Sequence, residues 1–388
     1  MIKRIKKIME SINNSGWLIN DVQTESIELF FVKKNMDMNR GKKVNHIDVT
    51  VYVDFEENKI KYKGSSKTRL SPTMSDAEMT NALDVAALAA SFVKNPYYEL
   101  VSPSDEKILY PTSNFSEGEF KEFGPRLAEA VYKADVYDNG KVNSTEFFIN
   151  KNDIRIVNSL GVDIAYTKYD GMIELITDWK EELDEVELYN MISFADFNPK
   201  VIYEEVKNSL LETKERAIAT SLPKIDGVPV LFGKNAVKTF MNYYIARTQL
   251  MYKYQGIFEA EIGESLQGDV KGDSVTKSLL PNLKNSTFSS PCDEDGFVLK
   301  DVDIVKDGKL ATYVGNKRYS DYLELEPTGI PRNTKVKHGS LSEKDMKSSP
   351  YLKLIALYDF QVNALTGDFD GEISLERNLY GEKTNPYP

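Results

Sequence analysis

The sequence predicts an α+β protein, with two helix–antiparallel-sheet units followed by a β-rich C-terminal domain. Amphipathic or capped helices alternate with groups of short strands, and this order of elements occurs twice within the first 222 residues. After Gly227 the pattern changes to short strands around one helix. We therefore expect units at 1–110 and 111–222, related by a duplication of element order, and a C-terminal domain at 223–388.

Composition narrows the class of protein. The 388 residues carry a net charge of −11, and their lysines and arginines are scattered among acids, so we expect no nucleic-acid partner. A single cysteine, Cys292, fits a reducing compartment. No apolar run is long enough for a membrane span, and the first residues lack the apolar core of a signal peptide. The expectation is a cytoplasmic protein that binds no membrane.

The first unit begins with a helix, because apolar residues recur at helical spacing over residues 2–12. Alternating patterns then predict three strands, at residues 26–34, 45–55 and 58–62. Ser75 and Glu78 form a capping box, which opens an alanine-rich helix that ends near Asn95.

The second unit repeats this order. A helix at 120–133 precedes four predicted strands, at residues 145–150, 154–158, 162–168 and 172–177. Asn158–Gly161 supplies a tight turn between two of them. Asn198 and Pro199 are typical of an N-cap and a first helical position, so a long helix is expected from there to about residue 220.

The C-terminal domain should be mainly antiparallel sheet with one helix laid on it. A buried strand at 228–232 passes through Gly233 into a helix at 236–250, and a long loop at 263–291 follows. Lys306–Gly308 predicts a hairpin between residues 302–305 and 310–314, and residues 352–360 form a further apolar run.

Residues 135–146 carry part of a calcium-binding loop. Asp135, Asn139 and Glu146 stand at positions one, five and twelve of an EF-hand pattern, after a predicted helix. Position three is Tyr137, which cannot replace the short oxygen ligand needed there. A hairpin leading into the second sheet is the favoured interpretation, and a calcium site is the alternative.

Other candidate sites are weaker. The acidic run Asp293–Gly296 has oxygen ligands but no partner run, so a solvated turn is favoured over a metal site. His46 and His338 are the only histidines, which argues against a histidine-rich zinc site. Cys292 lacks a base nearby in sequence, so a free structural cysteine is favoured over a nucleophile.

The helix at 236–250 follows a strand and a glycine turn, an order that enzymes use to present metal ligands. Zinc helices place two histidines on one face and a glutamate beside them. The corresponding places here hold Asn242, Tyr243 and Arg247, which are poor choices for a ligand, a general base and a ligand respectively. A packed helix with polar ends is the simpler interpretation, with Arg247 expected to pair with a carboxylate from within the chain or from a peptide C-terminus.

The chain resembles the TldD/PmbA family, whose members are also called modulators of DNA gyrase. The resemblance extends over most of the chain and depends on the order and spacing of several segments: Ser159–Gly161, the strand–turn–helix Pro229–Arg247, Ser290–Gly296, the hairpin Val305–Leu310 leading to Tyr313, Thr328–Gly329 and Leu365–Phe369.

The resemblance implies a function. In that family the TldD-type subunit is a zinc peptidase with H-E-x-x-x-H on this helix, which acts on unfolded or flexible peptides beside a TldE (PmbA) subunit that lacks the ligands. The motif falls on Asn242, Tyr243 and Arg247, so this chain is similar to the TldE/PmbA type. A non-catalytic, peptide-binding subunit is implied, with no metal, no cofactor, and either a TldD-like zinc peptidase or a second copy as partner.

Alternatives stay open at the level of sequence. The chain could be an autonomous peptidase that uses Cys292 or a carboxylate-bound metal, or a homodimeric peptide-binding protein without peptidase activity, so whether it is an enzyme is undecided. The TldD type also draws a cysteine ligand from a late strand. This sequence stops at Lys383–Pro388, about where that strand would begin, which fits either a truncated chain or a short family member.

Overall fold

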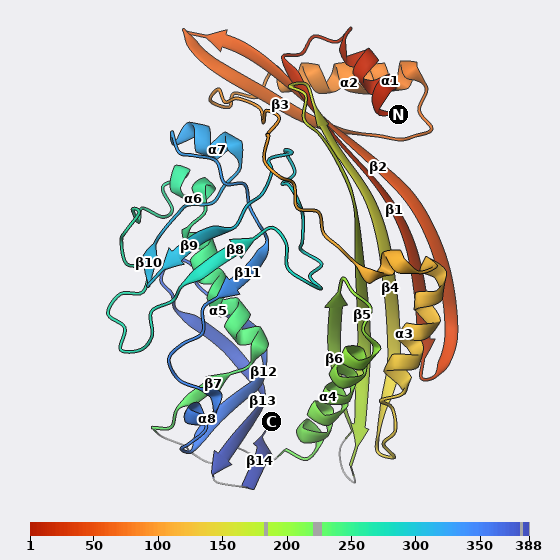
Figure 1. Cartoon of the computed structure of the whole chain (residues 1–388), viewed down its shortest axis with the longest axis vertical. Helices are drawn as coiled ribbons and strands as arrows, with labels where there is room; N and C mark the ends of the chain where they lie inside the picture. The colour runs from red at the N-terminus through yellow and green to blue at the C-terminus, as the bar shows by residue number, and fades with distance from the viewer. Residues whose placement is uncertain (182–184, 220–226, 381–382, 388) are drawn as a thin grey trace.

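The fold is α+β, as predicted. The structure is a computed structural model that describes residues 1–181, 185–219, 227–380 and 383–387. A long, twisted sheet runs along the molecule, and the C-terminal region (residues 227–387) lies on one side of it (Figure 1). No helix of the described part of the chain is both long and apolar enough to cross a membrane.

The first 219 residues contribute one six-stranded antiparallel sheet over their described part, in the order β3-β2-β1-β4-β5-β6. Its elements are α1 (Ile2–Met9), β1 (Gly16–Val32), β2 (Asn35–Glu57), β3 (Ile60–Leu70), α2 (Asp76–Ala90), the 3₁₀ turns η1 (Asn114–Glu117) and η2 (Phe120–Glu122), α3 (Phe123–Tyr132), β4 (Gly140–Asn158), β5 (Asp163–Lys180), β6 (Glu185–Phe194) and α4 (Pro199–Ala217).

The strands of the two predicted units therefore join through the β1–β4 pair, while the boundaries at 110/111 and 222/223 stay predictions. The sequence predicted short, separate strands at 145–150 and 154–158, and this was wrong, because both belong to the single strand β4. Polar residues interrupt the apolar alternation at Asn150 and Asn152, yet both side chains are hydrogen-bonded across the sheet to Asp170 of β5. The strand continues where the apolar pattern does not.

Because side chains alternate along a strand, the two faces of the sheet pack against different parts of the molecule. Ile19 and Leu29 lie on the same side of β1, the side covered by helices: Ile19 packs with α1 and α2, and Leu29 packs with α3 and α4. Leu18 faces the opposite side and packs in a cluster that includes Cys292 and Val298 of the C-terminal region. This contact anchors the C-terminal region near one end of the sheet.

The C-terminal region contains two four-stranded sheets among its described residues, β10-β9-β8-β11 and β14-β13-β12-β7. Both are antiparallel except for the parallel β7–β12 pair. The bounds are β7 (Val230–Phe232), α5 (Lys234–Arg247), α6 (Leu250–Tyr254), β8 (Lys277–Leu280), β9 (Val302–Lys306), β10 (Lys309–Leu310), α7 (Lys317–Tyr322), β11 (Asn333–Val336), α8 (Glu343–Met346), β12 (Tyr351–Val362), β13 (Phe369–Tyr380) and β14 (Lys383–Tyr387).

Several local predictions are confirmed. The Ser75–Glu78 capping box is present at α2, and the Asn198 side chain accepts the first amides of α4. Asp307 and Gly308 both have positive φ, 49° and 77°, as the predicted hairpin requires. The long loop predicted at 263–291 was wrong in one part, because it contains the buried strand β8.

Candidate functional site

Helix α5 is held between the two C-terminal sheets. The parallel pairing of β7 with β12 and a hydrogen bond from the Gly233 amide to the Leu354 carbonyl (2.9 Å) fix where the helix begins. Phe240 then packs against Phe360 and Phe369, with ring centroids 5.0 Å apart in each case. Towards the other sheet, Ile245 packs against the cluster centred on β8 and β9. The helix is therefore anchored on both sides.

Arg247, at the last position of α5, is engaged by its neighbours. Its guanidinium lies over the Tyr243 ring at 4.8 Å and over the Phe258 ring at 5.3 Å. It also donates a hydrogen bond to the Leu365 carbonyl, in the turn between β12 and β13. Within the described residues no carboxylate pairs with it, so the expected intramolecular carboxylate was wrong. A carbonyl and two aromatic faces take the place of that carboxylate.

The other two positions of the zinc motif point to different surroundings. The Asn242 side chain is exposed, whereas Tyr243 lies beside Gly367 and lines a groove of about 470 Å³. The groove is mostly aromatic and aliphatic, and its lining includes Phe232, Val237, Phe240, Met241, Tyr244, Leu266 and Val362. An exposed amide, a phenol and a guanidinium bound to a carbonyl do not form a ligand set for zinc. The residues present therefore do not fit a metal on α5.

Lys277 is a buried cation beneath this helix. Its side chain is fully buried and donates a hydrogen bond of 2.6 Å to the Met241 carbonyl of α5. Burial lowers the pKa of its ammonium group to about 8. The sequence prediction missed it within a presumed loop, although Val275, Lys277 and Leu279 alternate along one side of a strand. That alternation placed the lysine on the core face.

The calcium-loop candidates are spread along the chain. The Asp135 carboxylate is buried and forms an ion pair with Lys34 at 3.2 Å. Asn139 precedes β4, whereas Glu146 lies within β4, six residues after Gly140 and opposite Glu174. At about 3.3 Å per residue, six residues of strand span roughly 20 Å. The structure does not bring Glu146 to the loop of Asp135.

The acidic run and the cysteine lie where the C-terminal region meets the sheet. The Asp293 carboxylate accepts the amides of Asp295 and Phe297, and burial, followed by the charge of Asp295, raises its pKa to about 7. Burial, followed by Asp293, raises the pKa of the Cys292 thiol to about 12, which disfavours the thiolate. Among the described residues no three His, Cys, Asp or Glu side chains are grouped to hold a metal ion.

Comparisons with known proteins show which chains this one is similar to. Residues 226–386 match the model of the PmbA/TldA metallopeptidase C-terminal domain. The structure is similar to that of TldE from Thermococcus kodakarensis, with a TM-score of 0.80 and 14% identity over 100% of this chain and 89% of that chain. No curated protein matches the sequence.

Two further solved structures share the fold. One, from Thermotoga maritima, is described as a candidate modulator of a DNA gyrase, with a TM-score of 0.75 and 15% identity over 98% of this chain and 92% of that chain. The other, from Bacteroides thetaiotaomicron and described in the same way, has a TM-score of 0.74 and 12% identity over 97% and 90% of the two chains.

The fold and the site define the class: a chain with the C-terminal domain of a metallopeptidase, whose central helix carries no set of metal ligands. Residues 226–386 belong to the family of PmbA/TldA metallopeptidase C-terminal domains. The whole chain has the fold of the TldE and gyrase-modulator structures.

Proposed function

We propose that this chain is a non-catalytic, TldE-like subunit that assembles with a TldD-type zinc peptidase in the cytoplasm and helps to hold unfolded or flexible peptides. One observation carries the proposal. Arg247, at a position where a TldD-type subunit has a zinc ligand, is stacked on Tyr243 and Phe258 and bound to the Leu365 carbonyl. In this chain that position stabilises the C-terminal region.

The family and the fold support a role in an assembly. A subunit that keeps the scaffold but lacks the ligands can act on peptides only by binding or positioning them for another active site. The partner could be a TldD-type subunit or a second copy of this chain. We favour the TldD-type subunit because only it supplies the metal chemistry that α5 lacks here.

Co-expression with a TldD-type protein encoded beside this chain tests the proposal. The expected result is that the two chains purify together, and that a casein-like substrate is cleaved only when both are present and no chelator is added. Each chain alone, at the same concentration, is the control.

Three results would contradict the proposal. Stoichiometric zinc in this chain alone would show that it builds a metal site from other residues. Cleavage by this chain alone in the presence of chelator would favour an autonomous peptidase, for which Cys292→Ser is the first variant to examine. A stable homodimer that binds peptide and ignores the TldD-type protein would favour the homodimeric alternative.

A further inference from the structure

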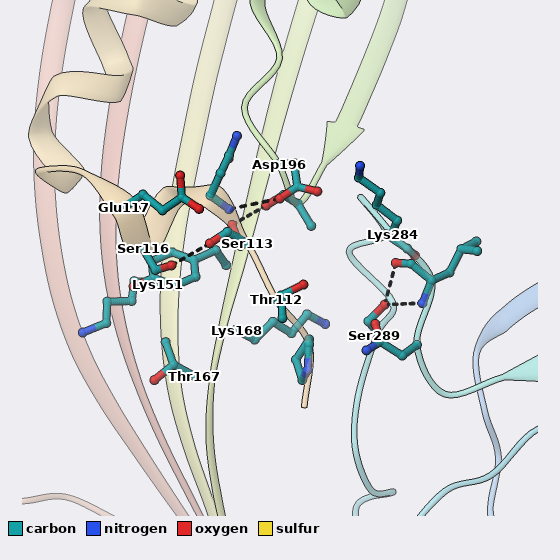
Figure 2. Close-up of a pocket in the computed structure, with 17 residues that line it drawn as sticks. Thr112, Ser113, Ser116, Glu117, Lys151, Thr167, Lys168, Asp196, Lys284 and Ser289 are labelled. Carbon is teal, nitrogen blue, oxygen red and sulfur yellow. Dashed lines mark hydrogen bonds between the residues drawn. The ribbon is translucent and has the colours of Figure 1, made fainter. Parts of the chain in front are cut away.

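A large cavity lies away from α5, between the long sheet and the C-terminal region. It has a volume of about 1010 Å³ and lies between β5, the segment at 111–117 and the loop at 282–289 (Figure 2). We call it the cleft. Cavities of this size hold a drug-sized ligand or a short peptide segment. Most of the residues that line it are polar, with several Ser, Thr, Asn and Lys side chains, which favours a ligand with polar groups.

Lys168 of β5 points across the cleft towards the loop that carries Ser289 (Figure 2). Its side chain is half-buried and has no hydrogen bond or ion pair among the described residues. Burial lowers the pKa of its ammonium group, an effect that Asp170 opposes and Arg332 reinforces. A desolvated ammonium without a partner costs free energy, and an anionic ligand would offset that cost.

None of the described neighbours of Lys168 forms a hydrogen bond or ion pair with its ammonium group. On the same face of the sheet, Asn150 and Asn152 are hydrogen-bonded to Asp170, at 2.8 and 2.7 Å, and they occupy both oxygens of that carboxylate. Thr112, on the segment at 111–117, lines the same cleft. The polar residues around Lys168 are therefore bonded to one another, while its ammonium faces the open cleft.

A second lysine lines the opposite side. Lys284, on the loop after β8, is exposed and has no hydrogen bond or ion pair within the described chain. Lys151 also lines the cleft, but it points away (Figure 2) and pairs with Asp153.

Two carboxylates belong to the cleft as well. Asp196 accepts the Asn114 amide at 3.0 Å, and Glu117 is exposed. The two lysines without a partner among the described residues, Lys168 and Lys284, come from different parts of the fold, one on each wall of the cleft.

The cleft is also braced. Asn285, in the same loop as Lys284, accepts the amides of Ala195 and Asp196 at 2.9 and 2.8 Å, and the Asn282 amide group donates to the Tyr110 carbonyl. These bonds connect the C-terminal region to the residues just after β6 and to Tyr110, which precedes the segment at 111–117. The loop that carries Lys284 is therefore bonded to the part of the fold that contains the long sheet, and such bracing favours a preorganised binding site.

We propose that the cleft binds carboxylate groups of an acidic peptide segment, and that Lys168 and Lys284 are the residues that recognise them. The anionic class follows from the unpartnered lysines, and the choice of a peptide rests on the proposed function. The polar walls and the volume suit an extended chain better than a single small ion.

Fluorescence anisotropy with the full chain tests this proposal. The probe is a labelled ten-residue peptide of Gly, Ser and four Glu, and its control has Gln in place of Glu. The acidic peptide should bind at least tenfold more tightly than the Gln peptide, and its affinity should fall as salt is added. Equal binding of the two peptides would overturn the proposal.

Matched variants assign the residues. Lys168→Met should weaken binding at least fivefold, and Lys168→Arg should retain most of it. Lys284→Met, a change at an exposed position that leaves the fold intact, should weaken binding two- to fivefold. Lys94→Met is the charge-matched control, because Lys94 pairs with Glu57 on an exposed surface outside the cleft, and it should change little. Equal effects of Lys94→Met and Lys284→Met would assign the binding to net charge and contradict the proposal.

Competition distinguishes the source of the anion. Millimolar inorganic phosphate should displace the peptide only weakly. If phosphate displaced it as completely as unlabelled acidic peptide does, the cleft would be a general oxyanion site, and the peptide assignment would be overturned. Because these measurements use this chain alone, failure of the TldD-type partner to co-purify leaves them intact. Failure of peptide binding likewise leaves the partner proposal standing.

Discussion

Burial of Lys277 makes the stability of the fold depend on pH. Its pKa is about 8 in the folded chain and near 10.5 when unfolded, so the unfolded state binds more protons between those values. Stability should therefore rise with pH from about 8 to 10.5, by roughly 1–3 kcal/mol. Below pH 8 the full cost of the buried charge is present.

Lys277→Met should remove that contribution. The variant is expected to be more stable relative to wild type at pH 7 than at pH 10, because only the wild type gains from losing the buried proton. Urea unfolding at both pH values measures the difference, and Lys335→Met, at an exposed position on the neighbouring strand β11, is the control. A difference that is independent of pH would show that the Lys277 ammonium is well solvated.

Arg247 contributes to the stability of the fold through the planar shape of its guanidinium as well as through its charge. Arg247→Lys keeps the charge but loses the planar stack on Tyr243 and Phe258, so we expect a loss of about 1–2 kcal/mol in the free energy of unfolding. Arg332→Lys changes an exposed ion pair with Glu294 and should cost less than about 0.5 kcal/mol. Equal small losses in both variants would mean that the stack contributes nothing.

At the scale of elements, α5 should not regain a metal site easily. Replacing Asn242 by His, Tyr243 by Glu and Arg247 by His restores the motif in sequence. The Asn242 side chain is exposed, however, whereas position 243 lies against the turn at Gly367 and position 247 holds that turn. We expect no tight zinc binding by calorimetry and reduced stability. Stoichiometric zinc at micromolar affinity would show instead that the helix still faces a site built for metal.

The elements that the sequence predicted well are those with local signals. The capping box at Ser75, the N-cap at Asn198 and the turn at Asp307–Gly308 each depend on side chains or backbone angles within four residues. The length of β2 was underestimated because residues 35–43 are exposed and mostly polar, so that no buried apolar face marks them as strand and only their pairing with β1 shows it. Such pairing depends on contacts with another strand, which the local sequence pattern does not show.

The site was predicted less completely for the same reason. The positions of Asn242, Tyr243 and Arg247 on one helix follow from sequence, but the Leu365 turn that covers Arg247 is 118 residues away. The cleft combines Lys168 and Lys284 from distant segments, and neither lysine stands in a recognisable motif. Only the folded chain shows that they lack partners.

At the scale of the whole molecule, the C-terminal region and the sheet form one unit through a small apolar contact. Leu18 and Ile156 of the sheet, and Val162 in the turn between β4 and β5, pack in one cluster with Cys292 and Val298. The Asn20 side chain donates to the Glu294 carbonyl, and the Tyr166 and Ser290 hydroxyls are 3.1 Å apart. These contacts join the C-terminal region to the sheet beside the cleft, so we expect the proposed anion site and this contact to respond to the same mutation.

Gly296→Ala tests that connection. Gly296 has φ of +85°, and a Cβ there would lie 2.7 Å from a methyl group of Val162, so alanine adds backbone strain and a clash within the contact. We expect a loss of about 2–4 kcal/mol in stability, faster proteolysis between the two parts and weaker binding of the acidic peptide. Gly263→Ala is the matched control, because Gly263 has φ of +94° but no atom within 4 Å of the methyl group that alanine would add, and it should cost only about 1 kcal/mol. If the two variants lose the same stability and bind the peptide equally well, the contact at Val162 does not set the width of the cleft.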